Sequence, residues 1–340
     1  MKTKATITLA VCLAFASTTL AQERGAARGG GGQPQVPAAD TLAPDIPGVV
    51  KGGTRVQVIK EGFNGTEGPI GMPDGSLIFT ETTANRITRI DKDGNTSPFL
   101  ENTNGSNGLA FDSKGRLISV QTTAGNTRIG VIYPKGQEAV LSDNIEGKPI
   151  GRPNDLVVDK KGGVYFTDPG PNAPARGAAP PTTPPLPPAV YYVAVGAKDV
   201  KVAEGIERPN GIQLSPDEKT LYVNNTSGEY ILAFDVKGDG TLEKKRNFAR
   251  YEGVTTAANG AFSSGADGIA VDADGRVYVA ATTGIQVFDG KGKHLGTIPL
   301  SRAPQNLAFA GPDKKTLYIV GRGAAWKIDM ITAGYKGRAK

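Results

Sequence analysis

The chain has 340 residues, a formal net charge of +6, one histidine and one cysteine. With His294 as the single histidine, in a turn after an expected outer strand, a Ser-His-Asp triad or a histidine-based zinc site is nearly excluded. The basic residues are scattered and form no stripe with interleaved aromatic residues, which disfavours nucleic-acid binding.

The first 21 residues are typical of a secretory signal peptide. Two lysines precede an apolar run that is too short to span a membrane. Cleavage after Ala21 removes Cys12, so the mature chain has neither a disulfide nor a thiolate nucleophile. We therefore expect a secreted, periplasmic protein without a membrane anchor. Residues 22–50 are rich in glycine, alanine and proline, and we expect them to form a flexible leader.

One phrase recurs along the remainder of the chain. At 267–279 it reads DGIAVDADGRVYV, which is typical of two short strands joined by a tight Asp-Gly turn. Its six copies begin at Glu67, Asn107, Asn154, Asn210, Asp267 and Asn306. Strand-rich repeats spaced roughly 40 to 60 residues apart indicate propeller blades.

The repeats predict an all-β, six-bladed β-propeller over residues 51–335. Residues 54–60 alternate in polarity and precede the first copy, so this N-terminal strand is expected to complete the last blade and remove a free sheet edge. A proline-rich insertion at 169–188 separates two strands of the third blade, because nine prolines in twenty residues cannot form a sheet interior. The insertion could be a lid over the channel or a solvated spacer.

The first residue of every copy, called the lead residue below, is a carboxylate or an amide. Equivalent positions of propeller blades lie at equal radius and height, so the lead residues are expected to form a polar ring near the central channel. Asn and Asp also suit turns that enter strands, but six in register favour the ring. Such oxygen ligands suit one divalent metal ion, with Ca²⁺ preferred over Mg²⁺, Mn²⁺ or Zn²⁺. Glu67 and Asp267 would neutralise it, and Asn154 and Asn210 would add amide oxygens, with Arg152 near the same channel mouth.

Four motifs in this order, EGP at 67–69, RPND at 152–155, PNG at 209–211 and ADG at 266–268, resemble the SMP-30/gluconolactonase/LRE family over residues 55–330. The resemblance implies a six-bladed propeller with a divalent metal in its channel and, in many members, hydrolysis of sugar lactones. It also implies roles for single residues: metal ligation by Glu67, Asn210 and Asp267, substrate or metal binding by Asn154, substrate contact by Arg152, and general-base catalysis by Asp267.

Two departures from the family pattern leave the sugar preference open. Gly65 and Thr66 stand where an aromatic residue often precedes EGP, and the histidine often found in the blade-two loop is replaced around Gln121–Thr123. We expect a metal-dependent hydrolase that opens a sugar lactone, in which water attacks a metal-polarised carbonyl and Asp267 is the base. The alternatives are a promiscuous esterase or phosphotriesterase on the same metal, and a non-catalytic ligand-binding propeller.

Overall fold

The computed structural model describes residues 36–170, 184–196 and 199–338. The expected signal peptide at 1–21 and most of the proline-rich insertion lie outside the described residues. Strands are the regular elements of the described part, and none of its segments is a helix long and apolar enough to cross a membrane.

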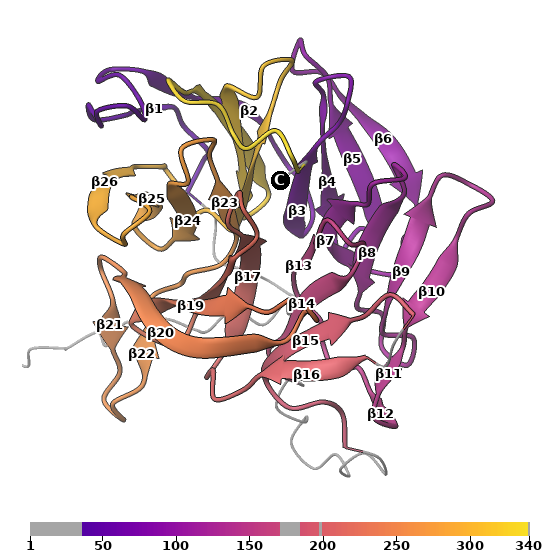
Figure 1. The fold of residues 1–340 in the computed structure, drawn as a ribbon. Coiled ribbons are helices and arrows are strands. Elements are labelled where there is room, and N and C mark those ends of the chain that lie inside the picture. Colours follow the sequence, from indigo (N-terminus) through magenta and orange to yellow (C-terminus); the bar gives the residue numbers. More distant parts are fainter. Residues whose placement is uncertain (1–35, 171–183, 197–198, 339–340) are drawn as a thin grey trace, which may run out of the picture. The chain divides into compact units, whose positions relative to one another are not determined.

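The strands form six antiparallel sheets, one for each sequence repeat (Figure 1). Blade one contains β3 (Thr66–Gly71), β4 (Leu77–Glu81), β5 (Arg86–Ile90) and β6 (Thr96–Glu101). Blade two contains β7 (Ser106–Phe111), β8 (Leu117–Gln121), β9 (Arg128–Tyr133) and β10 (Ala139–Ser142). Blade three contains β13 (Leu156–Val158), β14 (Val164–Asp168), β15 (Ala189–Val193) and β16 (Val200–Ala203).

The second half of the chain repeats the same order. Blade four contains β17 (Pro209–Leu214), β18 (Thr220–Asn225), β19 (Tyr230–Val236) and β20 (Leu242–Arg250). Blade five contains β23 (Ile269–Val271), β24 (Val277–Ala281), β25 (Gly284–Phe288) and β26 (His294–Ile298). Blade six contains β27 (Asn306–Ala310), β28 (Thr316–Gly321), β29 (Ala324–Asp329) and, from the N-terminal part, β2 (Arg55–Glu61) and β1 (Thr41–Leu42). Two short ribbons lie in the connections, β11 (Asn144–Ile145) with β12 (Lys148–Pro149) and β21 (Thr255–Thr256) with β22 (Phe262–Ser263).

The first strand of each blade lies innermost and contacts the first strand of the next blade. These contacts run from β3 to β7, β13, β17, β23 and β27 and return to β3, so six blades close the ring. Strand β2 pairs antiparallel with β29, which confirms that the N-terminal strand completes the last blade. Because every blade packs between two others, both faces of its inner strands are covered, and β24 is buried along its whole length.

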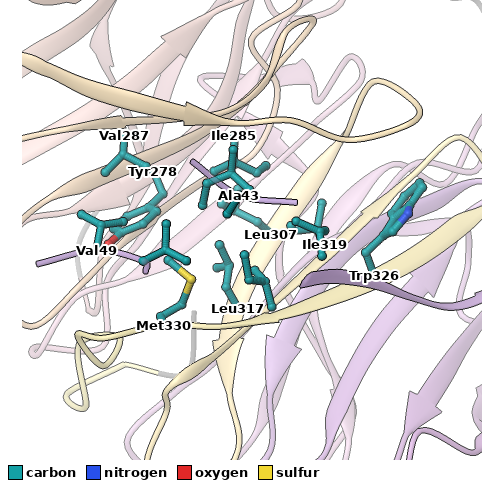
Figure 2. Packing of buried hydrophobic residues seen from close by; sticks show 14 of the residues in the cluster. Ala43, Val49, Tyr278, Ile285, Val287, Leu307, Leu317, Ile319, Trp326 and Met330 are labelled. Atoms are coloured by element: carbon teal, nitrogen blue, oxygen red, sulfur yellow. The ribbon is translucent and has the colours of Figure 1, made fainter. Parts of the chain in front are cut away.

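The start of the propeller corrects the expected boundary of the flexible leader at 22–50. Within that range, β1 pairs with β2, and Ile46 and Val49 are buried. They belong to a hydrophobic cluster that joins blades five and six and includes Tyr278 and Trp326 (Figure 2). Burying these apolar side chains stabilises the fold by about 25 cal/mol for each Å² removed from water. The apolar residues of this segment are spaced among prolines and glycines, which hid their role in the sequence.

The segment that follows β29 runs back to the inner strand of blade five, where the Tyr335 amide donates to the Val271 carbonyl at 3.2 Å. Its Arg338 lines a small cavity together with Ile70, Phe111 and Val158, which lie near the ends of the inner strands β3, β7 and β13. The lead residues stand at the opposite ends of these strands. Arg338 therefore occupies the end of the channel that is remote from the lead residues.

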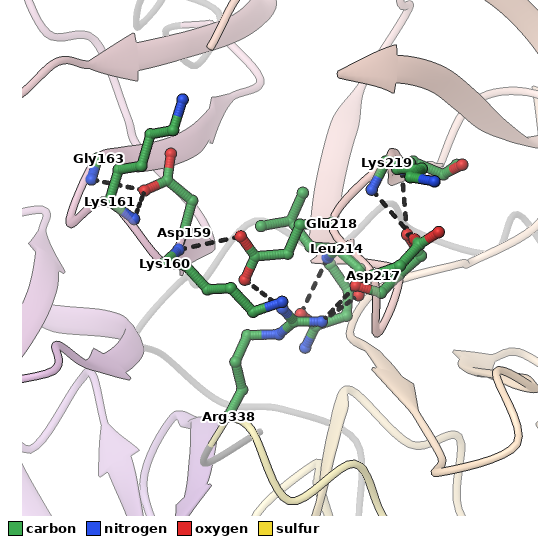
Figure 3. A network of polar contacts seen from close by, with 12 residues as sticks. Asp159, Lys160, Lys161, Gly163, Leu214, Asp217, Glu218, Lys219 and Arg338 are labelled. Atoms are coloured by element: carbon green, nitrogen blue, oxygen red, sulfur yellow. Dashed lines mark hydrogen bonds and ion pairs between the residues drawn. The ribbon is translucent and has the colours of Figure 1, made fainter. Parts of the chain in front are cut away.

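The contacts of Arg338 hold the segment in place (Figure 3). Its guanidinium forms an ion pair with Glu218 at 3.0 Å and donates to the carbonyl oxygens of Leu214 and Ser215 at 2.6 and 2.8 Å. Glu218 also accepts a hydrogen bond from the backbone of Lys160 at 3.0 Å. Arg338 thus attaches the C-terminal segment to blade four, and Glu218 links blade four to blade three.

Candidate functional site

The lead residues all stand where an inner strand begins. Four of them are the first or second residues of β3, β7, β17 and β27, and the other two stand two residues before β13 and β23. The predicted site residues Glu67, Asn154, Asn210 and Asp267 are therefore at the same end of the channel.

A glycine follows the lead residue in four blades, and it allows neighbouring inner strands to approach closely. A Cβ atom at Gly211 would lie 2.2 Å from the carbonyl oxygen of Asp267, and one at Gly268 would lie 2.1 Å from Oδ1 of Asn306. The Gly211 amide donates to that same carbonyl of Asp267 at 2.9 Å. The Asn-Gly and Asp-Gly pairs thus bring the lead residues of adjacent blades into contact.

Glu67 is buried, with 7% of its surface exposed, and amides of blade six orient its carboxylate. Gln305 Nε2 donates to Oε1 at 3.1 Å, and Asn306 Nδ2 donates to Oε2 at 3.3 Å. Asn306 also touches Gly268, the residue after Asp267. Blade six therefore lies between the two carboxylates of the predicted metal site, where it contacts the Glu67 carboxylate and the residue next to Asp267.

Asn210 carries the clearest sign that the site suits a cation. Its Nδ2 donates to Thr226 Oγ1 at 3.0 Å, and that hydroxyl donates in turn to the Ala266 carbonyl oxygen at 2.7 Å. The hydroxyl proton is thus used, so Thr226 offers Asn210 an acceptor and fixes which way its amide points. Asn210 Oδ1 is then buried and has no hydrogen-bond partner among the described residues. An orphaned amide oxygen beside carboxylates fits a cation.

Asp267 is held through its backbone. Its amide donates to the Ala280 carbonyl at 2.8 Å, and its carbonyl accepts from Asn224 Nδ2 at 2.7 Å. The side chain is half-buried. Nowhere in the part of the chain that the structure describes do three or more histidine, cysteine, aspartate or glutamate residues gather as a metal cluster. The expected site has only two such residues, because amide oxygens make up the rest.

Asn154 adjoins Asn210 through the second strand of its own blade. The Asn154 amide donates to the Thr167 carbonyl at 2.8 Å, and the Thr167 hydroxyl donates to the Asn210 carbonyl at 2.6 Å. The Asn154 carbonyl accepts from Gly108 of blade two at 3.0 Å. Its half-buried side chain starts at the same level as that of Asn210.

Charged residues of three blades influence the guanidinium of Arg152. Burial lowers the pKa of its guanidinium, nearby Arg208 lowers this pKa further, and the carboxylates of Asp168 and Asp267 raise it. Arg152 and Asp267 thus share one electrostatic environment.

Asp168, which the sequence reasoning missed, anchors the segment of Arg152. Its fully buried carboxylate accepts from the backbone amides of Gly151 at 2.8 Å, Arg152 at 3.1 Å and Gly170 at 2.8 Å. Burial raises the pKa of Asp168, although these amides and Arg152 oppose the rise. A signal existed in the sequence, since an aspartate ends the second strand where the proline-rich insertion begins.

The proline-rich insertion emerges beside the site. It joins β14 to β15, whose end residues Asp168 and Ala189 are direct partners, as the sequence predicted. Its first part touches Arg152, since Arg152 Nε donates to the Gly170 carbonyl at 3.4 Å. Residues 171–183 lie outside the described residues, so the choice between lid and spacer stays open.

Two other polar features lie away from the lead residues. His294 opens the outermost strand of blade five, where its Nε2 is 3.1 Å from Thr297 Oγ1. A cavity of about 460 Å³ lies between blades one and two, and its lining includes Gln121 and Arg128 but no lead residue. Neither feature belongs to the candidate site.

Comparisons with known proteins agree with this architecture. The family described as SMP-30/Gluconolactonase/LRE-like region matches residues 65–322. A gluconolactonase of Zymomonas mobilis subsp. mobilis is 28% identical over 319 residues, which cover 86% of each chain.

Among solved structures, a gluconolactonase of Xanthomonas campestris is 29% identical, has a TM-score of 0.69, and the match covers 87% of this chain and 99% of the other. The calcium-binding protein regucalcin of Agrobacterium tumefaciens shares the fold at 19% identity, with a TM-score of 0.64 and coverage of 83% and 98%.

Proposed function

The chain belongs to the SMP-30/gluconolactonase/LRE-like family, and from this premise we propose that it is a metal-dependent hydrolase that opens a sugar lactone. The observation that carries the proposal is the buried, orphaned Oδ1 of Asn210, which Thr226 turns towards the ring that contains Glu67 and Asp267. The similarity to gluconolactonases over most of both chains supports a lactone as the substrate.

Four residues would hold one divalent cation: Glu67, Asn154, Asn210 and Asp267. Two carboxylates neutralise the ion, and amide oxygens complete an all-oxygen ligand set that suits Ca²⁺ before the softer metals. When bound, the cation supplies Lewis-acid polarisation of the lactone carbonyl.

The chain's own residues supply the proton transfer and the orientation. Asp267 is the general base that takes a proton from water as the water oxygen bonds to the carbonyl carbon. The ring C–O bond then breaks, and the proton passes to the departing ring oxygen, which gives a hydroxy acid. Asn154 donates a hydrogen bond to the developing oxyanion, and Arg152 donates to polar groups of the substrate away from the reacting carbonyl. Asp168 fixes the backbone from which Arg152 reaches the substrate.

The leader sequence supports an exported location, so the mature protein would act on a small molecule in the periplasm. We expect no nucleic-acid partner and no membrane anchor.

Asp267→Asn tests the proposed base directly. The amide keeps an oxygen for the cation but cannot take a proton, so we expect kcat for an aldonolactone to fall at least about 100-fold, in line with the loss of a general base. The measurement is acid release by the mature protein at saturating Ca²⁺. Full activity of this variant would remove Asp267 from the mechanism. Arg246→Ala, on the outer strand β20, is the control for effects of substitution far from the site.

A further inference from the structure

The position two residues before each lead residue differs sharply between blades. It is glycine in blades one, two and five, proline in blade six, and arginine in blades three and four. The two arginines, Arg152 and Arg208, both begin the sequence Arg-Pro-Asn. Charged residues therefore stand at this level of the channel mouth in two adjacent blades.

The glycine blades show that this asymmetry is built into the backbone. Gly65, Gly105 and Gly265 all have positive φ, between 62° and 83°. A Cβ atom at Gly65 would lie 2.4 Å from Thr82 Oγ1, and one at Gly265 would lie 2.1 Å from Thr282 Oγ1. A side chain at these positions requires a rearranged backbone, so blades one, two and five leave this level of the mouth without side chains.

The arginine blades have a different and matching anchor. In blade three, the Arg152 amide donates to the carboxylate of Asp168, at the end of β14. In blade four, the Arg208 amide donates to Oδ1 of Asn225, at the end of β18, at 3.1 Å. The Arg208 carbonyl accepts from the Thr226 amide at 3.0 Å. Polar side chains at equivalent strand ends thus set both arginines at the same height.

The segments of the two arginines lie side by side in neighbouring blades, since the Thr167 hydroxyl of blade three donates to the carbonyl oxygen of Asn210, two residues after Arg208, at 2.6 Å. Both guanidinium groups also have hydrogen-bonding capacity to spare. Arg208 Nε is buried without a hydrogen-bond partner among the described residues, and Arg152 Nε has only a long bond of 3.4 Å to Gly170. A bound anion would balance the two positive charges and satisfy the donors, because the planar fork of a guanidinium matches the oxygens of carboxylate and phosphate.

We propose that Arg152 and Arg208 together bind an oxyanion of the substrate, so that the preferred lactone carries a carboxylate or phosphate group. This inference rests on the proposed lactone hydrolysis and adds the chemical class of the substrate. Arg208 is then a specificity-determining residue that none of the sequence motifs singled out. The lactone ring lies towards Asp267, and the anionic group lies towards blades three and four.

Three lactones that share one aldonolactone ring and end in a hydroxymethyl, a carboxylate or a phosphate group test the proposal. For the calcium-loaded mature protein, we expect kcat/KM to be higher for at least one anionic lactone than for the neutral one. The carboxylate and phosphate arms distinguish the two sources of the oxyanion. In Arg208→Ala, the ratio of anionic to neutral kcat/KM should fall about 10- to 100-fold, the loss expected for a hydrogen bond to a charged group.

Two further variants separate charge from packing. Arg208→Lys keeps the charge and should retain part of the preference, and Arg246→Ala on the outer face of blade four should retain all of it. A wild-type protein that favours the neutral lactone, or an Arg208→Ala variant with an unchanged ratio, overturns the proposal.

A binding measurement separates this proposal from the proposed activity. If no lactone is hydrolysed, calorimetric titration with inorganic sulfate tests the anion site by itself. A sulfate affinity that falls at least tenfold in Arg208→Ala supports the anion site, although the proposed activity has failed. Sulfate binding that is absent, or equal in the two proteins, overturns the anion site.

Discussion

Thr226→Val is the sharpest test of how the metal site is oriented. Valine has nearly the shape of threonine, but it cannot accept the hydrogen bond from Asn210 Nδ2 (3.0 Å) or donate to the Ala266 carbonyl (2.7 Å). The Asn210 amide is then free to turn, and its Oδ1 is no longer held towards the other lead residues. The substitution therefore changes the orientation of the proposed metal ligand Asn210 without replacing Asn210 itself.

The expected losses of metal affinity and of stability follow from the two hydrogen bonds that the substitution removes. Loss of an outer hydrogen bond to a metal ligand typically costs about 10- to 100-fold in metal affinity, which corresponds to roughly 1.4 to 2.7 kcal/mol. The Ala266 carbonyl and the Asn210 amide also lose partners, so the free energy of unfolding should fall by about 1 to 3 kcal/mol. Both effects are measurable, because the folded state persists at 25 °C when the starting stability is typical.

Calcium titration of metal-free protein by calorimetry measures the affinity. Thr226→Ser is the matched control, since it keeps the hydroxyl and should bind Ca²⁺ nearly as the parent does. An affinity of Thr226→Val within about threefold of the parent value would refute the reasoning, because the amide of Asn210 would then need no orientation by Thr226.

The remaining predictions concern the far end of the channel. Arg338→Ala leaves Glu218 without its ion pair at 3.0 Å and removes two hydrogen bonds to carbonyl oxygens; we expect the free energy of unfolding in urea to fall by about 3 to 5 kcal/mol, and a loss below 1 kcal/mol would contradict the described contacts. Burial, with a contribution from Arg338, lowers the pKa of Lys314 from 10.5 to about 8. Between these pH values the unfolded chain binds more protons than the folded chain, so the folded state becomes more stable as pH rises. Relative to Lys314→Met, the parent should gain up to about 3 kcal/mol in free energy of unfolding between pH 8 and 10.5. A stability difference that is constant over this range would show that Lys314 keeps its ordinary pKa.

The turn phrase made the blades predictable, since each copy specifies two strands of one sheet and the lead residue stands at a constant offset from the turn. That offset predicts that Glu67, Asn210 and Asp267 lie at one end of the channel, and the structure places all three where inner strands begin. The local pattern also located the insertion between β14 and β15, because proline interrupts pairing wherever it occurs.

Other parts of the site depend on contacts that no local pattern contains. Thr226 and Asp168 act across the strand pairing of their blades, so their roles require the register. Arg338 meets Glu218 across 120 residues of sequence, and the apolar residues near Val49 bury against blades that lie at the other end of the chain. Ring closure brings such distant residues together. A sequence repeat indicates that the ring closes, but it does not identify which residues meet.

Lactone hydrolysis with and without metal tests the central claim most directly. Acid release from an aldonolactone would be followed for the mature protein after chelation, and again after Ca²⁺ is added back, with Mg²⁺, Mn²⁺ and Zn²⁺ in parallel. The account predicts that turnover disappears on chelation and returns with a divalent cation, Ca²⁺ giving the largest recovery. Turnover that is unchanged in the metal-free protein, or absent with every cation despite calorimetric binding, would contradict it.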